Sequence, residues 1–549
     1  VENDFTIDGI LNIYNDYSSN KIETNDFEIN NEDHTFIIDG SLNLTNIFDN
    51  FSRQDTLSEN NLFFGAFNSV AIDTSFIIIG SPTATFSFED NDIACGKLLV
   101  YNYDITTDNK LTIYKENVDE NKPVQTLLPS ILGDNSLFGY SVKLYETSLV
   151  ASAVKLSYES DALHKGGLFY YEFNSSSDSW VEQQDLSADD LNANDLLGFK
   201  LDMDASFIVA STYEGYSTNT NKGSKVYVYK KDDDGSFNQI QKLKALDDDD
   251  EEITDTFTYF GYSVKLQKTN DKHYLFVGSI ANSVYHTAGA VYIYEYDDLS
   301  FNKIQKIDGL GDISGVNPFV SDKDFFGCSI DSRISTNDND ESIVELLIGS
   351  YGADNVLDDI GTLKVYDAGA AYRFDLSMTS QLFEIVKTGL EQSGDDSDPK
   401  NWMYTQTNPE RNDRYGSSVK FNDKNVIISA ANKNSKAGNV FIYDLDNNTN
   451  FKEGFEQIIE QPSGSEMYFG NSINLQENVL LIGSRKQKVF AYVKRKNVFS
   501  VGGDLRLTDN ITDVSGNLTV YENVNVERLK IKDSSRLWHD GNNDENIDF

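Results

Sequence analysis

The sequence predicts an all-β protein, a seven-bladed β-propeller with a β-rich stem segment at each end of the chain. Three observations lead to this fold class. Seven glycines at intervals of 54 to 89 residues each follow an aromatic residue or a leucine, four short apolar runs follow a typical copy, and no run keeps a helical period over about 11 residues.

The seven glycine pairs mark the predicted start of each blade. They are Phe64-Gly65, Phe138-Gly139, Leu197-Gly198, Phe260-Gly261, Phe326-Gly327, Tyr415-Gly416 and Phe469-Gly470. A four-stranded unit cannot bury both faces alone, but copies arranged around an axis cover one another. Seven copies therefore predict seven blades. Beside a bulky residue, glycine lets the backbone pass close to the neighbouring blade, so we interpret the pairs as packing positions and not as ligand contacts.

The fourth copy, residues 259–307, shows the repeating unit most clearly. It reads as an alternating run YSVKLQ, a continuous apolar run YLFVGS, a second alternating run GAVYIYEY and a closing run FNKIQKI. Alternation is typical of a half-buried strand, and a continuous apolar run is typical of a strand buried on both faces. Each unit is therefore expected to supply four strands.

The succession of aromatic-Gly, Ser-Val, Val-Gly-Ser and Gly-Ala-Val-Tyr-Ile-Tyr resembles the FG-GAP repeat. This repeat builds the seven-bladed propeller of integrin α subunits and of many secreted proteins. The resemblance spans roughly residues 51–495 and implies an integrin-α-like propeller there. It implies a fold more strongly than a function, because propellers host many functions.

The predicted last blade lacks its fourth run, and a copy of that run precedes the first glycine pair. This copy is FSRQDTL, Phe51–Leu57, and it is expected to lie beside KVFAYV at 488–493. The ring would then close between the two ends of the chain. We accordingly assign residues 1–50 to an N-terminal stem segment, 51–495 to the propeller and 496–549 to a C-terminal stem segment.

The two flanks share one phrase, Gly, any residue, Leu, any residue, then an aliphatic residue. It occurs in IDGILNIYN, IDGSLNLTN, VGGDLRLTD and VSGNLTVYE, beginning at Ile7, Ile38, Val501 and Val514. Such phrases resemble the stem repeats of viral and phage fibres and of β-solenoid adhesins. Two independent β-hairpins lying on the propeller are the alternative. In the stem interpretation, flanks of sister chains pack together, because short strand pairs bury little alone.

Two acidic clusters are candidate calcium sites. Family blades often carry a loop Asp-x-Asp-x-Asp-Gly-x-x-Asp between their first two strands, which suits a hard cation. Here that connection is mostly too short. The fifth blade keeps Asp338, Asp340 and Glu341 without the turn glycine, and the chain end has a second cluster at Asp540, Asn542, Asp544 and Asp548. Calcium is thus the one possible cofactor, and the blades are not expected to need it.

Composition excludes several classes of function. The chain has 89 acidic and 45 basic residues and a formal net charge of −44, which opposes binding to nucleic acid. The sequence contains no run of about 18 apolar residues, so no transmembrane helix is predicted. Its two cysteines, Cys95 and Cys328, do not form a disulfide framework, and Cys328 is expected to be a buried, inert thiol.

No enzyme motif is present: the five histidines are scattered, and no metalloprotease or nucleophile-elbow pattern occurs. We therefore predict a non-enzymatic protein of the extracellular space or of a virion or cell surface, a fibre or adhesin component whose propeller binds a receptor or glycan. Two alternatives remain. One is a purely structural component of a capsid, filament or surface layer, and the other is a secreted propeller glycosidase with a carboxylate pair near the axis.

Overall fold

The structure is a computed structural model of the 549-residue chain. It describes residues 12–13, 27–29, 36–38, 42–44, 49–58, 63–66, 68–88, 91–105, 111–115, 122–157, 164–213, 223–247, 249–253, 258–281, 288–308, 324–336, 342–353, 355–357, 363–365, 367–376, 382–385, 404, 410–445, 455–461, 468–485, 487–496, 498–501, 505–507, 511–514, 517–520 and 524–525.

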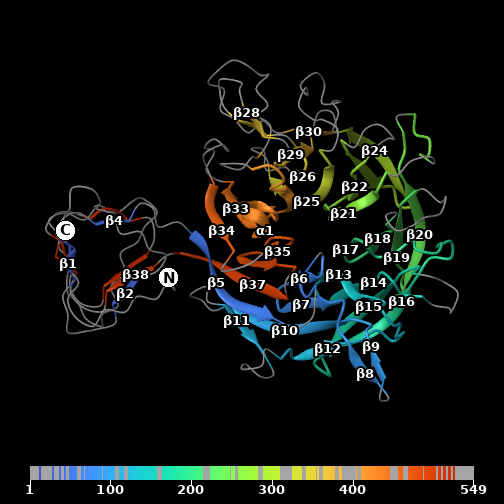
Figure 1. Ribbon diagram of the computed structural model, residues 1–549, viewed down its shortest axis with the longest axis horizontal. Helices are drawn as coiled ribbons and strands as arrows, with labels where there is room; N and C mark the ends of the chain where they lie inside the picture. The colour runs from blue at the N-terminus through green and yellow to red at the C-terminus, as the bar shows by residue number, and fades with distance from the viewer. Residues whose placement is uncertain are drawn as a thin grey trace. The chain divides into compact units, whose positions relative to one another are not determined.

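Seven antiparallel sheets surround a central channel, which confirms the predicted seven-bladed β-propeller (Figure 1). In the first six sheets the first strand is innermost and the later strands follow outward in chain order. The first three blades are β6 (Val70–Ile72), β7 (Phe76–Ser81), β10 (Lys97–Ile105), β11 (Leu111–Tyr114) and β12 (Gln125–Leu127); β13 (Phe138–Tyr145), β14 (Ser148–Ala153), β15 (Gly167–Asn174) and β16 (Ser179–Leu186); and β17 (Leu201–Met203), β18 (Phe207–Ser211), β19 (Lys225–Lys231) and β20 (Phe237–Lys244).

The next three blades keep the same order, and in the last blade the outermost strand comes from residues that precede the first blade. These four blades are β21 (Phe260–Lys268), β22 (His273–Ser279), β23 (Ala290–Tyr296) and β24 (Phe301–Asp308); β25 (Phe326–Thr336), β26 (Ser342–Ser350), β29 (Ala370–Leu376) and β30 (Phe383–Ile385); β31 (Tyr415–Phe421), β32 (Asn425–Ala430), β33 (Asn439–Asp444) and β34 (Phe455–Glu460); and β35 (Ser472–Gln476), β36 (Val479–Gly483), β37 (Lys488–Lys496) and β5 (Asp49–Ser58).

The first blade departs from the expected four strands, because two short strands share its outer position. The N-terminal half of β10, around Leu99, pairs with β12, and its C-terminal half, around Tyr103, pairs with β11. The break falls where other blades carry a β-bulge, for example between Tyr170 and Tyr171. An insertion at this bulge therefore divides the fourth strand in two without disturbing the rest of the sheet.

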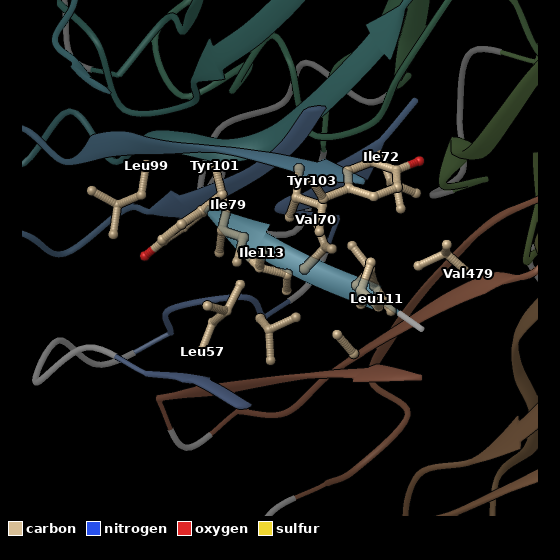
Figure 2. Packing of buried hydrophobic residues seen from close by; sticks show 14 of the residues in the cluster. Leu57, Val70, Ile72, Ile79, Leu99, Tyr101, Tyr103, Leu111, Ile113 and Val479 are labelled. Carbon is tan, nitrogen blue, oxygen red and sulfur yellow. The ribbon is translucent and has the colours of Figure 1, made fainter. Parts of the chain in front are cut away.

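The ring closes as the sequence predicts, because β5 completes the last blade beside β37. Apolar residues from this blade and from the first blade then form one buried cluster. Figure 2 shows Leu57 of β5 and Val479 of β36 in the same cluster as Ile79 and Tyr101 of the first blade. The other hydrophobic clusters also lie between neighbouring blades, so most of the apolar burial that stabilises the fold is shared between units.

Close backbone contacts between blades explain the glycine pairs. A methyl group on Gly483, in the last blade, would overlap the carbonyl oxygen of Gly65, in the first. Gly65 itself has φ +67°, a conformation that side chains disfavour. The same contact joins Gly278 to Gly327, from the fourth blade to the fifth. The closing interface therefore has the geometry of an interior one, and the packing role predicted for the pairs is confirmed.

Glutamines join the outer strands of successive blades. Gln184 on β16 donates from Nε2 to the Phe237 carbonyl (3.0 Å) and accepts from the Phe237 N–H (2.8 Å). Three further pairs repeat both bonds: Gln125 with Trp180, Gln241 with Phe301, and Gln305 with Phe383. Each glutamine thus satisfies two backbone groups of the next outer strand.

Few other elements occur in the described part of the propeller. The hairpins β8 (Phe86–Phe88) with β9 (Asn91–Ile93) and β27 (Asn355–Leu357) with β28 (Leu363–Val365) extend from the first and fifth blades. The assigned helix α1 (Lys433–Lys436) is one turn, and Asn434 and Ser435 within it have positive φ. None of the described helices is long and apolar enough to cross a membrane.

Contacts divide the chain into two compact units, Arg53–Val493 and a second unit made of Val1–Ser52 with Lys494–Phe549. The described strands of the second unit are β1 (Asn12–Ile13), β2 (Phe27–Ile29), β3 (Phe36–Ile38), β4 (Leu42–Leu44), β38 (Val498–Val501), β39 (Leu505–Leu507), β40 (Ile511–Val514), β41 (Asn517–Val520) and β42 (Val524–Asn525). They form three sheets, β1-β3-β39-β42, β2-β38-β41 and β4-β40.

All pairings between these described flank strands are parallel, and each sheet combines strands from both ends of the chain. Strands β2, β3 and β4 belong to the second, first and third of these sheets, in that order. Strands β38 to β42 belong to the second, first, third, second and first sheets, which is the same cyclic order. Register places Phe27 opposite Phe499, which in turn lies opposite Leu518. The strand path therefore continues in one pattern across the inserted propeller.

Candidate functional site

The channel of the propeller contains a cavity of about 510 Å³ that residues from all seven blades line. This volume falls within the range of about 300–1,000 Å³ that is typical of small-molecule sites. Many lining residues lie where the first strands begin and the second strands end, such as Leu137 before β13 and Val154 after β14. We call this end of the channel the mouth.

A repeated backbone conformation shapes the mouth. The residue two positions before each blade-start glycine has a positive φ of 50–65° although it is not glycine. These residues are Phe63, Leu137, Leu196, Tyr259, Phe325, Arg414 and Tyr468. Because the conformation recurs in every blade, it belongs to the repeat and does not mark one strained site.

Aromatic rings gather on one side of the mouth. Phe199 stacks on Tyr213 with ring centroids 4.3 Å apart, and it also contacts Tyr140 at 6.0 Å and Tyr262 at 5.8 Å. We call these four residues the aromatic cluster. All four line the cavity and are half-buried. Aromatic side chains in the wall of a cavity suit packing against apolar ring faces of a ligand.

Two arginines stand elsewhere around the mouth. The Arg414 guanidinium lies 5.4 Å from the ring centroid of Tyr351, and the Arg485 guanidinium lies 4.8 Å from that of Tyr468. Both arginines line the cavity. Stacking on an aromatic face holds each planar guanidinium in place at the cavity wall, and Arg485 also donates from Nε to Asn471 Oδ1 at 3.4 Å.

Lys200 lies next to the aromatic cluster, at a position where most blades have serine. Its Nζ donates to Asn68 Oδ1 at 3.0 Å and lies 5.4 Å from the ring centroid of Phe199. Burial lowers the pKa of its ammonium group to about 8. Among the described residues, no carboxylate forms an ion pair with Lys200.

Further along the inner strands, lysines and aspartates alternate around the channel. Lys143, Asp202, Lys265, Asp331 and Lys420 each lie four residues after a blade-start glycine, in five successive blades. We call these five the charged ring. At about 3.3 Å per residue they lie roughly 10 Å deeper than the mouth.

Each aspartate of the charged ring bridges two lysines. Asp202 Oδ1 lies 2.7 Å from Lys143 Nζ, and its Oδ2 lies 3.9 Å from Lys265 Nζ. Asp331 Oδ1 lies 3.3 Å from both Lys265 Nζ and Lys420 Nζ. Burial raises the pKa of both carboxyls, but the neighbouring lysines outweigh it and hold each pKa below its ordinary value. Both aspartates therefore stay ionised at neutral pH.

The charge of the cavity opposes the charge of the chain. Seven basic residues line it, Lys143, Lys155, Lys200, Lys265, Lys420, Arg414 and Arg485, and Asp202 is the single acidic residue among the lining residues that the structure describes. The whole chain has nearly twice as many acidic residues as basic ones. The cavity can therefore attract a small anion that the outer surface would repel.

Both sets of candidate calcium ligands, Asp338, Asp340 and Glu341 and Asp540, Asn542, Asp544 and Asp548, lie outside the described residues. Within the described residues, no group of three or more His, Cys, Asp or Glu side chains could hold a metal ion. Both cysteines are free and buried. Burial raises the pKa of Cys328 to about 12, so the expected buried thiol is confirmed.

Sequence reasoning missed the aromatic cluster, the mouth arginines and the charged ring. The signal was available once the repeats were aligned on their glycines. The residue after that glycine is Tyr140, Phe199 or Tyr262 in three successive blades, and the next residue is serine in most blades but Lys200 in the third. Only the closed ring brings these positions together, because they lie in different repeats.

No family model and no curated protein sequence matches the chain, so the resemblance to the FG-GAP repeat rests on the residues quoted above. Among solved structures it is similar to Sqt1 of Saccharomyces cerevisiae, with 9% identity and a TM-score of 0.39, over 80% of this chain and 100% of that chain. It is also similar to selenomethionine-substituted virginiamycin B lyase of Staphylococcus aureus, with 10% identity and a TM-score of 0.39, over 81% and 99%. These similarities concern the fold alone.

Proposed function

We propose that this chain is a non-enzymatic surface protein, extracellular or on a virion or cell surface, whose FG-GAP-like propeller binds a receptor or glycan at the channel mouth. The observation that carries the proposal is the composition of the cavity, basic and aromatic in a chain that is otherwise strongly acidic. A concave site with convergent polar groups and an aromatic lining is the usual form of a ligand site.

The flanks support a display role. Strands from both ends of the chain pair in parallel, as Phe36 does with Leu505 and Leu42 with Ile511, so they are joined to each other and not folded as separate hairpins. We propose that they form a stem through which sister chains associate. The same pairing would suit a purely structural component of a capsid, filament or surface layer, in which the mouth has no ligand.

The glycosidase alternative has less support. A general acid needs a carboxyl whose pKa is raised so that it stays protonated until it reacts. Asp202 and Asp331 lie between lysines that lower their pKa. Both are better suited to hold the channel together than to transfer a proton.

A glycan array probed with the full-length chain tests the proposed function. Binding should depend on the aromatic cluster, so Phe199→Ala should lose it. Tyr114→Ala, which removes an exposed ring from β11 outside the cavity, should not. Circular dichroism and thermal melting of each variant would check folding. Absence of binding to any glycan or to host-cell surfaces would favour the structural alternative.

A further inference from the structure

Lys200 differs from the other lysines that line the inner channel. Lys143, Lys265 and Lys420 each lie within 3.3 Å of an aspartate oxygen. The described polar contact of Lys200 is with the amide oxygen of Asn68, which is neutral. A half-buried ammonium group without a counter-ion is costly, so such a group is expected where an anion binds.

The side chains around Lys200 suit a ligand that has a ring as well as a negative charge. Its Nζ lies 5.4 Å from the ring centroid of Phe199 and 5.9 Å from that of Tyr262. These two rings belong to the aromatic cluster, so a ligand ring stacked there would lie next to the ammonium group. Ser417 and Asn471 add polar groups to the cavity wall, where Ser417 Oγ lies 3.0 Å from Ser429 Oγ and Asn471 Oδ1 accepts a hydrogen bond from Arg485 Nε at 3.4 Å.

The mouth arginines extend the positive charge across the channel. Arg414 and Arg485 come from the sixth and seventh blades, whereas Lys200 comes from the third. An anion inside the cavity therefore has basic groups on more than one side. A long polyanion would also meet the acidic outer surface of a chain with net charge −44, so a compact ligand with few charges is favoured.

We propose that the mouth binds an acidic saccharide, with its pyranose ring on the aromatic cluster and its carboxylate or sulfate facing Lys200. This proposal rests on the proposed function and specifies its ligand. Lys200 supplies the charge, the aromatic cluster supplies the stacking surface, and Arg414 and Arg485 contribute to attraction at the rim. The shared chemistry is one anionic group on a sugar ring.

A matched set of monosaccharides tests this assignment. Glucuronic acid and glucose 6-sulfate carry the two anionic groups, the methyl ester of glucuronic acid removes the charge, and glucose is the neutral reference. Binding to the full-length chain is measured by ligand-observed NMR or calorimetry at pH 7. At least one acidic sugar should bind about tenfold or more tightly than both neutral ones, and the preference between the two acids identifies the anion.

Variants then test whether Lys200 supplies the positive charge that binds the anionic group. Lys200→Met should weaken binding of the acidic sugar about tenfold and remove its advantage over the methyl ester. Lys230→Met is the matched control, because Lys230 Nζ also lies over an aromatic ring, 5.3 Å from the Tyr296 centroid, but outside the cavity. It should bind like the unmodified chain. If Lys200→Met does not fold, Lys200→Gln provides the same comparison with a polar side chain.

The outcomes separate this proposal from the proposed function. Equal binding of glucuronic acid and its methyl ester would overturn the acidic-saccharide assignment and leave glycan binding intact. Equal affinity for acetate or inorganic sulfate would show that only an anion is recognised, which also overturns it. Binding of no sugar in this set, together with an empty glycan array, would contradict both proposals.

Discussion

Lys200 in the third blade donates a hydrogen bond from Nζ to Asn68 Oδ1 in the first blade, 3.0 Å away. The contact joins two blades that are not neighbours in the ring, so the lysine side chain extends into the channel. It also leaves the ammonium group without a carboxylate partner among the described residues. The properties of the mouth should therefore depend on the protonation of this one group.

Affinity for an acidic sugar should fall as the pH rises through about 8. Lys200 has its pKa lowered to about 8 by burial, and only its protonated form attracts an anion. Between pH 7 and pH 9 the charged fraction falls about tenfold, and affinity should follow it. Tyr262 and Cys328, which face Lys200, have their pKa raised to about 12 by burial and stay neutral. Titration of glucuronic acid binding against pH measures the effect, and a flat profile would contradict it.

Gly483→Ala should destabilise the whole propeller by about 3 kcal/mol or more, because the new methyl group would overlap the Gly65 carbonyl oxygen and force the closing blades apart. Gly235→Ala is the control. Its φ of +90° disfavours alanine by about 1–2 kcal/mol, but no heavy atom lies closer than 4.0 Å to the new methyl group. Denaturant unfolding compares the two, and equal losses would refute the closure contact.

Gln184→Leu should cost about 1–3 kcal/mol, because the Phe237 N–H and carbonyl of the next blade both lose their partner. The neighbouring Gln183 lies on the same strand but donates only to the carbonyl of Val181. Gln183→Leu should therefore be close to neutral. Thermal melting of both variants is the measurement, and the idea fails if the two substitutions behave alike.

Asp331→Asn should cost about 3–5 kcal/mol at neutral pH, because Lys265 and Lys420 would lose their shared carboxylate. The lysines lower the pKa of Asp331 despite its burial, so its stabilisation is complete above the ordinary value of 3.8 and disappears as the pH falls through the lowered pKa. The stability difference between variant and unmodified chain should therefore shrink below about pH 4. Asp190→Asn, which removes an exposed ion pair with Lys242, should cost at most about 1 kcal/mol.

The flanks, and not the propeller, should drive self-association. The propeller completes its last sheet by pairing β5 with β37, so no blade needs a strand from a partner chain. A fragment covering residues 49–496 should sediment as a monomer, whereas the full-length chain should not. A full-length chain that stays monomeric at high concentration, with folded flanks, would show that the flanks do not form an assembling stem.

The blades could be predicted from the sequence because the signals for their strands lie within each repeat. The glycine pairs, the apolar runs and the displaced closing run Phe51–Leu57 are all local signals. The division of the outer strand in the first blade was not predictable, because β11 and β12 both resemble ordinary short strands. The charged ring was missed for a different reason. Lys143, Asp202 and Lys265 are scattered over three repeats, and in an acidic chain one charged residue per repeat indicates a solvated surface unless the ring geometry is already known.

The pairing of the two chain ends has a consequence for how the protein is made. Leu42 pairs with Ile511, which a ribosome adds 469 residues later. At about 5–20 residues per second, the first strands would wait roughly 25 to 95 s for their partners. The closing blade waits similarly, because β5 is the first strand of the propeller to be translated and β37 is the last. A chain that stops before β37 would therefore leave both the closing blade and the flank sheets with bare strand edges, which are templates for aggregation.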